Sequence, residues 1–191
     1  MTSIRQRYEK LETERTPFLD RARECSKLTL PTLVPDSGHS ASSKFYTPFQ
    51  GIGARGVNNL ASKLLLALVP PNSPFFRLTV DDFKLQELTQ QEGARAEVEE
   101  ALSSIERAVM SEIESSSVRI ATFEALKHLL VAGNVLLYLP EAEGGMRVFH
   151  MDRYVIKRDP MGNALELITK EDISPETLSP ELQALCDMDQ Q

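Results

Sequence analysis

The chain has 191 residues, a formal net charge of −7 and a hydrophobic share of 41%. This length suits one domain, or one domain with a substructure, and it is sufficient to bury a core. The negative charge argues against broad phosphate binding by the chain as a whole. No apolar run reaches the length of a membrane span, so no membrane partner is expected.

Charge is unevenly distributed along the chain. Residues 1–30 carry seven basic and five acidic side chains, residues 81–116 carry three basic and ten acidic ones, and residues 171–191 carry six acidic and no basic ones. Acidic segments of this kind are most often solvated helical faces. A surface that repels DNA is the alternative interpretation.

The cysteine and histidine residues predict no cofactor or metal site. Cys25 and Cys186 lie far apart, and no signal peptide is recognisable, so two reduced thiols in a cytosolic setting are expected. His39, His128 and His150 are scattered and lack the spacing of a metal-binding motif.

The first third of the chain predicts helices and one irregular connection. Apolar spacing in residues 4–11 indicates a short helix on a charged segment. A second helix is expected to start with Thr16 as N-cap and Pro17 at its first position, and to end at Pro31. Residues 31–47, rich in serine and proline, should form either a functional arm or a strap packed on its neighbours.

Residues 47–71, TPFQGIGARGVNNLASKLLLALVPP, predict the most distinctive helix. Thr47 is a plausible N-cap, Pro48 a favourable first residue, and Pro70 with Pro71 a stop signal. Apolar and small residues recur at helical spacing on one face. These are Phe49, Ile52, Gly53, Gly56, Val57, Leu60, Ala61, Leu64 and Leu68.

Gly51, Gly53 and Gly56 also match the spacing G-x-G-x-x-G, which is associated with dinucleotide binding. That motif needs a buried strand before it and an acidic residue about 20 positions later, and both are missing here. A nucleotide-binding enzyme is therefore only the weaker alternative. We expect Gly53 and Gly56 instead to be close-packing positions, each costing the helix roughly 1 kcal/mol relative to alanine.

The polar side of the same helix carries Arg55, Asn58, Asn59 and Lys63. A solvated face is the simpler interpretation of these residues. A contact with a neighbouring subunit is the alternative, and it makes them candidate subunit-contact residues.

The middle of the chain predicts a strand and three further helices. Alternation in residues 75–80 indicates a strand, and Asp81 or Asp82 should cap a short helix. A long amphipathic helix with an acidic outer face follows over residues 98–113. A last helix should begin after the serines at 115–117 and end at Gly133-Asn134.

The pattern then changes to hairpins. Residues 135–139 pair with 146–149 in the first predicted hairpin, and residues 154–156 pair with 165–168 in the second. Helix resumes after Pro180. The fold class is therefore α+β and mainly helical, with amphipathic helices packed on a small antiparallel sheet near residues 134–169.

No catalytic set is convincing. Glu124 and His128 are spaced four residues apart and are expected to form a surface ion pair. His150, Asp152 and Arg153 lie at a strand end, where a loop hydrogen-bond cluster is the simpler interpretation and ligand orientation the alternative. We expect no enzymatic activity.

Three segments together carry a more specific signal: residues 47–71, then FEALKHLLVAGNVLLYLPEAEG, then RYVIKRDPMGNALELITKEDI. In this order, and with ERTPFLDRARECSKLTLPTLVP before them, the chain resembles the portal protein, or head–tail connector, of short-tailed podovirus-type bacteriophages. The resemblance spans nearly the whole chain. A helical adaptor that binds a protein partner is the alternative for a chain of this composition.

The resemblance implies a structural role without catalysis. Portals are homo-oligomeric rings, usually dodecamers, at one capsid vertex, through which double-stranded DNA is packaged and ejected. Capsid, scaffolding, terminase and tail adaptor proteins would be partners, and the protein would occur in the virion and, during assembly, in the host cytoplasm.

The resemblance also implies a domain plan. Family chains are much longer than 191 residues, so the stem and the clip should lie beyond Gln191. Residues 1–132 would form the helical wing, residues 133–170 a β-hairpin region leading toward the stem, and residues 171–191 an acidic helical tail. Acidic faces would then limit sticking of DNA near the ring.

Overall fold

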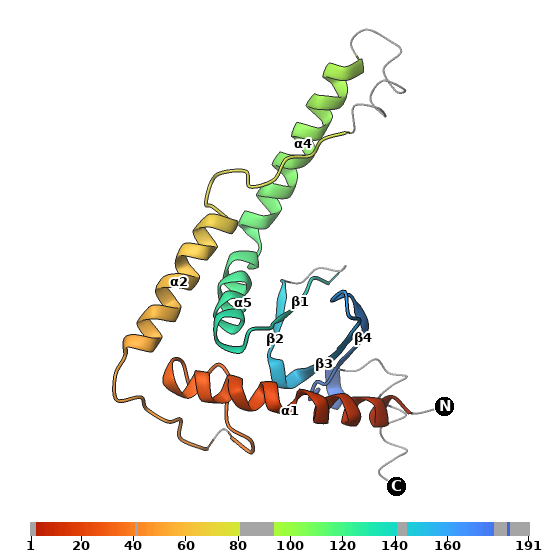
Figure 1. The fold of residues 1–191 in the computed structure, drawn as a ribbon. Coiled ribbons are helices and arrows are strands. Elements are labelled where there is room, and N and C mark those ends of the chain that lie inside the picture. Colours follow the sequence, from red (N-terminus) through yellow and green to blue (C-terminus); the bar gives the residue numbers. More distant parts are fainter. Residues whose placement is uncertain (1–2, 41, 81–93, 141–144, 178–182, 184–191) are drawn as a thin grey trace. The chain divides into compact units, whose positions relative to one another are not determined.

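The computed structural model describes residues 3–40, 42–80, 94–140, 145–177 and 183 (Figure 1). These residues form a mainly helical α+β fold, as expected from the sequence. The chain divides into two compact units. Unit 1 combines residues 1–16 with 152–191, and unit 2 consists of residues 17–151. The limits of these units differ from the domain plan outlined above.

One continuous helix, α1 (Ile4–Leu28), replaces the two helices predicted at the N-terminus. Pro17 lies inside it, and Thr16 is not an N-cap, since its Oγ1 donates to the carbonyl of Glu12 at 3.0 Å within the helix. Proline removes one helical hydrogen bond, so the sequence signal for a break was real. Tertiary packing offsets that loss, because each half of α1 contributes buried side chains to a core.

The segment after α1 is a strap packed on that helix. Between Leu28 and Ile52 the described residues form neither helix nor strand. The hydroxyl of Ser26, fully buried, donates to the carbonyl of Leu30 at 2.7 Å and accepts from the backbone N–H of Val34 at 3.1 Å. The first part of the predicted irregular connection therefore belongs to the core of unit 2.

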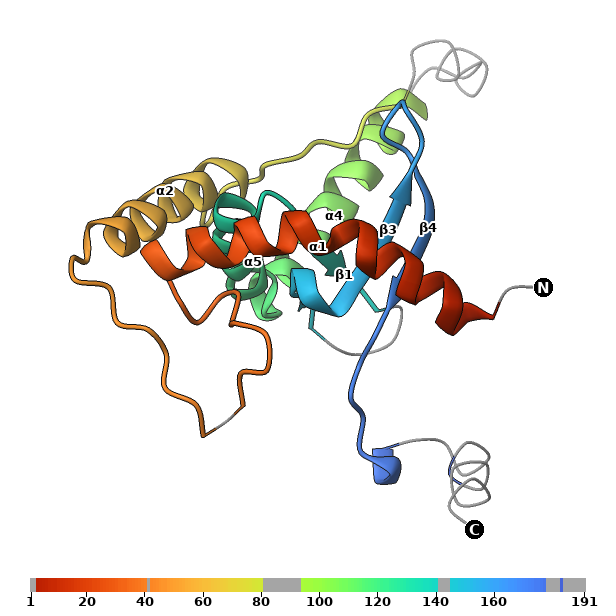
Figure 2. The same ribbon diagram turned by 60° about the horizontal axis from the view of Figure 1, so that its bottom comes forward.

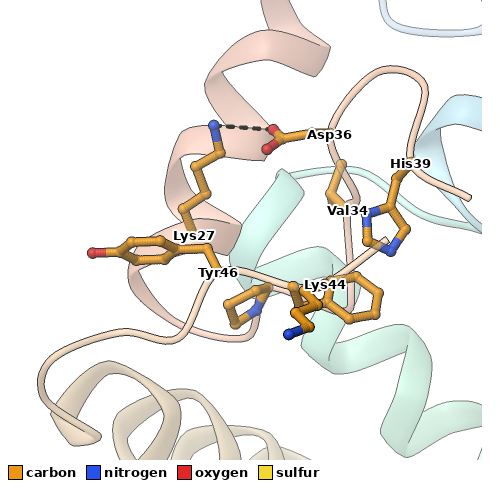
Figure 3. A pocket seen from close by; sticks show the side chains of 8 residues that line it. Lys27, Val34, Asp36, His39, Lys44 and Tyr46 are labelled. Atoms are coloured by element: carbon orange, nitrogen blue, oxygen red, sulfur yellow. Dashed lines mark ion pairs between the residues drawn. The ribbon is translucent and has the colours of Figure 1, made fainter. Parts of the chain in front are cut away.

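A small pocket lies between the end of α1 and this connection (Figure 3). Lys27 pairs with Asp36 at 3.0 Å on one side, and His39 packs on Phe45 with ring centroids 4.1 Å apart on the other. The pocket volume of about 30 Å³ is enough for about two water molecules. A ligand of nucleotide size does not fit there.

Helix α2 (Ile52–Leu68) begins four residues later than predicted, with Gly51 rather than Thr47 at its N-cap. This start keeps Gly51 out of the helix interior, where a glycine costs about 1 kcal/mol. The end is as predicted: Val69 leaves the helical conformation because the residue before a proline disfavours it.

Residues 75–80 do not form the predicted strand. Their alternating pattern is compatible with an extended backbone, but the described chain offers them no partner strand. The N–H of Leu78 instead donates to a carboxylate oxygen of Glu106, at 2.6 Å. The short helix predicted after Asp82 lies outside the described residues.

Two long helices follow, and both were predicted. Helix α4 spans Ala94–Ser115, and helix α5 spans Val118–Ala132. Helix α5 packs on α2. Gly133 ends α5 in the left-handed conformation, with a φ of 73°. Within the part of the chain that the structure describes, no helix combines the length and the apolarity that crossing a bilayer would need.

Each predicted hairpin forms its own two-stranded antiparallel sheet. In unit 2, β1 (Leu136–Tyr138) pairs with β2 (Arg147–Phe149). In unit 1, β3 (Tyr154–Arg158) pairs with β4 (Ala164–Thr169). A single small sheet was the sequence expectation, and the separation places one hairpin in each unit. The tail helix predicted after Pro180 falls almost entirely outside the described residues.

Unit 1 is held together by the first half of α1 and the second hairpin (Figure 2). Tyr8 and Leu11 pack against Val155, with Ile168 beside them. The guanidinium of Arg15 donates to the carbonyl of Tyr154 at 2.6 Å. Burial raises the pKa of Tyr154 to about 12, since the phenolate would lose its hydration.

Unit 2 has a core of its own. The second half of α1, the strap, α5 and Met151, which lies two residues after β2, contribute side chains to it. It buries apolar side chains that are far apart in the sequence, so it fixes the tertiary arrangement of these elements. Its buried members are Leu19, Ala22, Leu33, Val34, Val131 and Met151.

Candidate subunit-contact surface

The polar face of α2 is exposed along its length. Arg55, Asn58, Asn59 and Lys63 are all solvent-exposed. Ala61, on the opposite face, is completely buried, and helical geometry places it away from Arg55 and Asn59. The candidate contact residues therefore lie on a surface that another molecule can reach.

Apolar side chains on α2 are exposed as well, and the sequence analysis missed this. Ile52, Leu60 and Leu68 belong to the predicted apolar face, yet their exposed fractions are 69%, 46% and 54%. Leu66, 58% exposed, lies on the side of Arg55 and Asn59. Periodicity identifies an apolar stripe but does not show whether the same chain covers it.

The two glycines of the predicted close-packing pair differ. A Cβ on Gly53 would clash with the carbonyl oxygen of Leu28, so the end of α1 lies directly beside this position. At Gly56, apart from the adjacent residues and the helix's own backbone, nothing in the described chain lies within 4 Å of such a Cβ. Close packing at Gly56 therefore does not occur within the described chain, and a neighbouring molecule would have to provide it.

Helix α4 also keeps its apolar stripe open. Among its described side chains, from residue 96 to 115, none is buried. Ile105 and Val109 are 50% and 39% exposed. The carboxylates that give this helix its acidic face are exposed too, with Glu106 as the half-buried exception that binds the backbone of Leu78.

The glycine motif lacks the structural context of a dinucleotide site. Residues 42–50, which lead into Gly51, form neither helix nor strand. The fingerprint works only when a buried strand delivers the chain to the glycines at the start of a helix. Gly51 does serve as an N-cap, but no strand precedes it.

The structure brings together two histidines that the sequence analysis treated as scattered. His128 on α5 is buried, so it is not the surface residue that the sequence predicted. Glu124 instead approaches His150, with 3.6 Å between its Oε1 and Nε2 of the imidazole. The rings of His128 and His150 lie 4.4 Å apart between centroids.

Asp152 and Arg153 belong to a short 3-10 helix, Met151–Arg153, that precedes β3 in unit 1. The guanidinium of Arg153 donates to the Asp172 carboxylate. This hydrogen bond, helped by the positive charge, lowers the pKa of Asp172. The cluster differs from the predicted one of His150, Asp152 and Arg153, because Asp172 is the hydrogen-bond partner of Arg153 and His150 approaches Glu124. Asp152 lies 3.9 Å from the Arg153 guanidinium.

A mainly helical chain whose helices leave apolar stripes open is typical of a subunit that is completed by neighbours. Comparison with known proteins agrees with this class. The family described as bacteriophage head to tail connecting protein matches residues 1–191, so the chain belongs to that family.

Individual relatives give the same result. The portal protein of Escherichia phage T7 is 46% identical over 171 residues, and that of Enterobacteria phage T3 is 43% identical over 170 residues; each alignment covers 87% of this chain. The portal protein of Enterobacteria phage SP6 is 34% identical over 173 residues, or 91% of this chain. The chain spans about a third of the length of these relatives, 32% to 33%.

Proposed function

We propose that the protein is a portal subunit, which forms a ring at one capsid vertex through which double-stranded DNA is packaged and ejected. The observation that carries this proposal is the family match over all 191 residues, together with relatives named portal protein. Because the chain spans only a third of those relatives, the proposal concerns the complete protein.

The partners follow from the same proposal. The ring would be a homo-oligomer, with twelve subunits as the expected number. It would contact capsid and scaffolding proteins, dock terminase during packaging and bind tail adaptor proteins afterwards. The protein would therefore be a virion component that passes through the host cytoplasm during assembly, and it would have no catalytic activity of its own.

Within the ring, we place the lateral contact on the exposed side of α2. Arg55 and Lys63 supply positive charge, and Asn58 with Asn59 supplies hydrogen-bonding amides. Exposed leucine on the same helix adds apolar area, which a stable interface needs at its centre.

Residues 48–132 would make the outer and inter-subunit layer of the wing, and residues 134–169 would lead toward the stem. The acidic faces of residues 81–116 and 171–189 would face the path of the DNA and limit its sticking. This last assignment fails if those carboxylates lie in subunit contacts and away from the channel in the assembled ring.

Electron microscopy of the protein expressed from its complete reading frame tests the ring. A closed ring with an axial channel supports the proposal, and a compact monomer at every concentration overturns it in favour of an adaptor. The double substitution Arg55→Glu and Lys63→Glu should then reduce the fraction of subunits in rings. Lys10→Glu with Lys157→Glu, an equal charge change at two exposed residues of unit 1, serves as the matched control for the α2 contact.

A further inference from the structure

Three potential metal ligands, Glu124, His128 and His150, converge in unit 2. Glu124 and His128 lie one turn apart on α5, which puts both side chains on the same face of the helix. His150 follows β2 directly, and β2 packs on α5. The ligand atoms of the three side chains all lie within 4.8 Å of one another.

These separations are close to those of a bound metal ion. Ligands at 2.0–2.1 Å from a tetrahedral ion lie about 3.3 Å apart. The carboxylate oxygen of Glu124 and Nε2 of His150 are already 3.6 Å apart. The side chains of Glu124 and His150 are 45% and 40% exposed, so a small rotation of either one can close the remaining distance.

The ligand types indicate which ion would bind. Two imidazoles and one carboxylate suit zinc, which is commonly held by two histidines and a glutamate with water in the fourth position. Magnesium and calcium prefer sites built from oxygen alone. One carboxylate also offsets half of the charge of a divalent ion.

The burial of the three ligands also suits this role. His128 is only 1% exposed, so one ligand is fixed by the surrounding core. The other two lie at the surface, where an ion can enter and keep water in its open position. Lys127, the nearest ammonium in the sequence, is held over the ring of Phe123 at 4.6 Å.

We propose that Glu124, His128 and His150 form a zinc site that links α5 to the chain after β2. The ion would tie together two elements that are otherwise joined through the first hairpin, and it would stabilise unit 2 by binding the folded state alone. The inference does not depend on ring formation, because all three ligands come from one chain.

Isothermal titration with zinc chloride tests the proposal on the full-length protein. Cys25 is an exposed free thiol and Cys186 a second possible zinc ligand, so both are first replaced by serine. One zinc ion per chain should bind, and the thermal midpoint should rise with zinc but not with magnesium. Glu124→Gln and His150→Gln should each weaken the affinity at least about tenfold, since even outer-sphere partners contribute about 10–100-fold.

His39→Gln is the matched control, because His39 is the third histidine of these 191 residues and lies outside the cluster. It should leave zinc affinity unchanged. Circular dichroism must show that the three glutamine variants keep the fold, and since His150 and Glu124 are surface residues they should. No zinc binding in the protein with Cys25→Ser and Cys186→Ser, or equal losses in His39→Gln and His150→Gln, overturns the proposal.

Discussion

Helices α4 and α5 follow each other in the chain, both are amphipathic in sequence, and they differ in what covers them. Helix α5 buries five side chains, including Ala125, Leu126 and Val131. Helix α4 buries none among its described side chains, and Ile105 is half exposed. The same periodic pattern therefore has two outcomes in one molecule.

The difference separates two uses of an apolar stripe. On α5 the stripe stabilises the fold of the subunit, because burying apolar area from water drives folding. On α4 the stripe contributes little to that fold and remains available to another molecule. Substitutions on the two helices should therefore affect different measurements: the first the stability of the subunit, the second its assembly.

The largest contrast is expected from truncating one apolar side chain on each helix. Leu126→Ala should lower the free energy of unfolding by about 2–5 kcal/mol, because it leaves a cavity in the core. Ile105→Ala should cost less than about 1 kcal/mol, because half of that side chain is already in water. Urea denaturation of dissociated subunits measures both.

Equal losses for the two variants would mean that α4 is covered within the subunit. A loss for Ile105→Ala that appears only in the assembled protein would place its stripe at an interface.

Gly53 and Gly56 on α2 allow the same comparison between a covered and an open position, since substitution by alanine adds one Cβ at each. Gly53→Ala should destabilise the subunit by about 1–3 kcal/mol, since the new methyl would meet the carbonyl of Leu28. Gly56→Ala should stabilise it by up to about 1 kcal/mol, since space is open and alanine favours helix. Thermal denaturation of the two variants should show a lower midpoint for Gly53→Ala and a higher midpoint for Gly56→Ala than for the wild-type protein.

Destabilisation by both substitutions would contradict the difference in packing. If Gly56→Ala stabilises the subunit but reduces ring formation, a neighbouring subunit approaches that glycine.

Substituting Arg119 on α5 and Arg107 on α4 should give a smaller difference in stability. Arg119 on α5 donates to the carbonyls of Val69 and Pro70 at 3.1 and 2.8 Å, and so ties the end of α2 to α5. Arg119→Met should cost about 1–2 kcal/mol, because it removes these hydrogen bonds but keeps most of the stem. The measurement is the urea midpoint at constant slope.

Arg107 on α4 is the control, since its hydrogen bonds to described residues are those with Ser103 and Ser104 on its own helix. Arg107→Met should change stability by less than about 0.5 kcal/mol. A larger effect there than at Arg119 would be inconsistent with the proposed difference between the helices.

At neutral pH, the smallest effect on the free energy of unfolding is expected from removing the buried hydroxyl of Tyr154. Tyr154→Phe should change stability by less than about 1 kcal/mol there, since the buried hydroxyl has no hydrogen-bond partner among the described residues. Burial raises the pKa of Tyr154 to about 12, above the ordinary value of 10.0. Its contribution is therefore fully present below pH 10 and is lost as the pH rises toward 12.

The wild-type protein should lose up to about 1.4 kcal/mol per pH unit relative to Tyr154→Phe in that range. Urea denaturation between pH 8 and 11.5 measures the difference. Parallel pH profiles for the two proteins would show that the hydroxyl is hydrated.

The sequence predicts the elements whose signals are local. Helix α4, helix α5, its glycine stop at Gly133 and both hairpins form as expected, because periodicity, capping and turn chemistry act within a few residues. The resemblance that places the chain in its family also depends on long strings of sequence, and the family match bears it out.

The predictions that fail are those that tertiary packing decides. The helix break at Pro17 does not occur, because two cores hold the halves of α1. The strand predicted at residues 75–80 does not form, and the described residues offer it no partner strand. Periodicity alone also could not reveal that His128 is buried beside His150, since the two residues are 22 positions apart.

Helix α1 contributes to both compact units, and this has a consequence for synthesis. Unit 1 needs residues 1–16 together with 152–177, and the 135 residues from 17 to 151 are made in between. At a translation rate of about 5–20 residues per second, about 7–27 s pass between the synthesis of Tyr8 and Leu11 and that of their partners in the second hairpin. The first residues translated are therefore among the last to reach a core, and a chaperone that covers their apolar face would act in that interval.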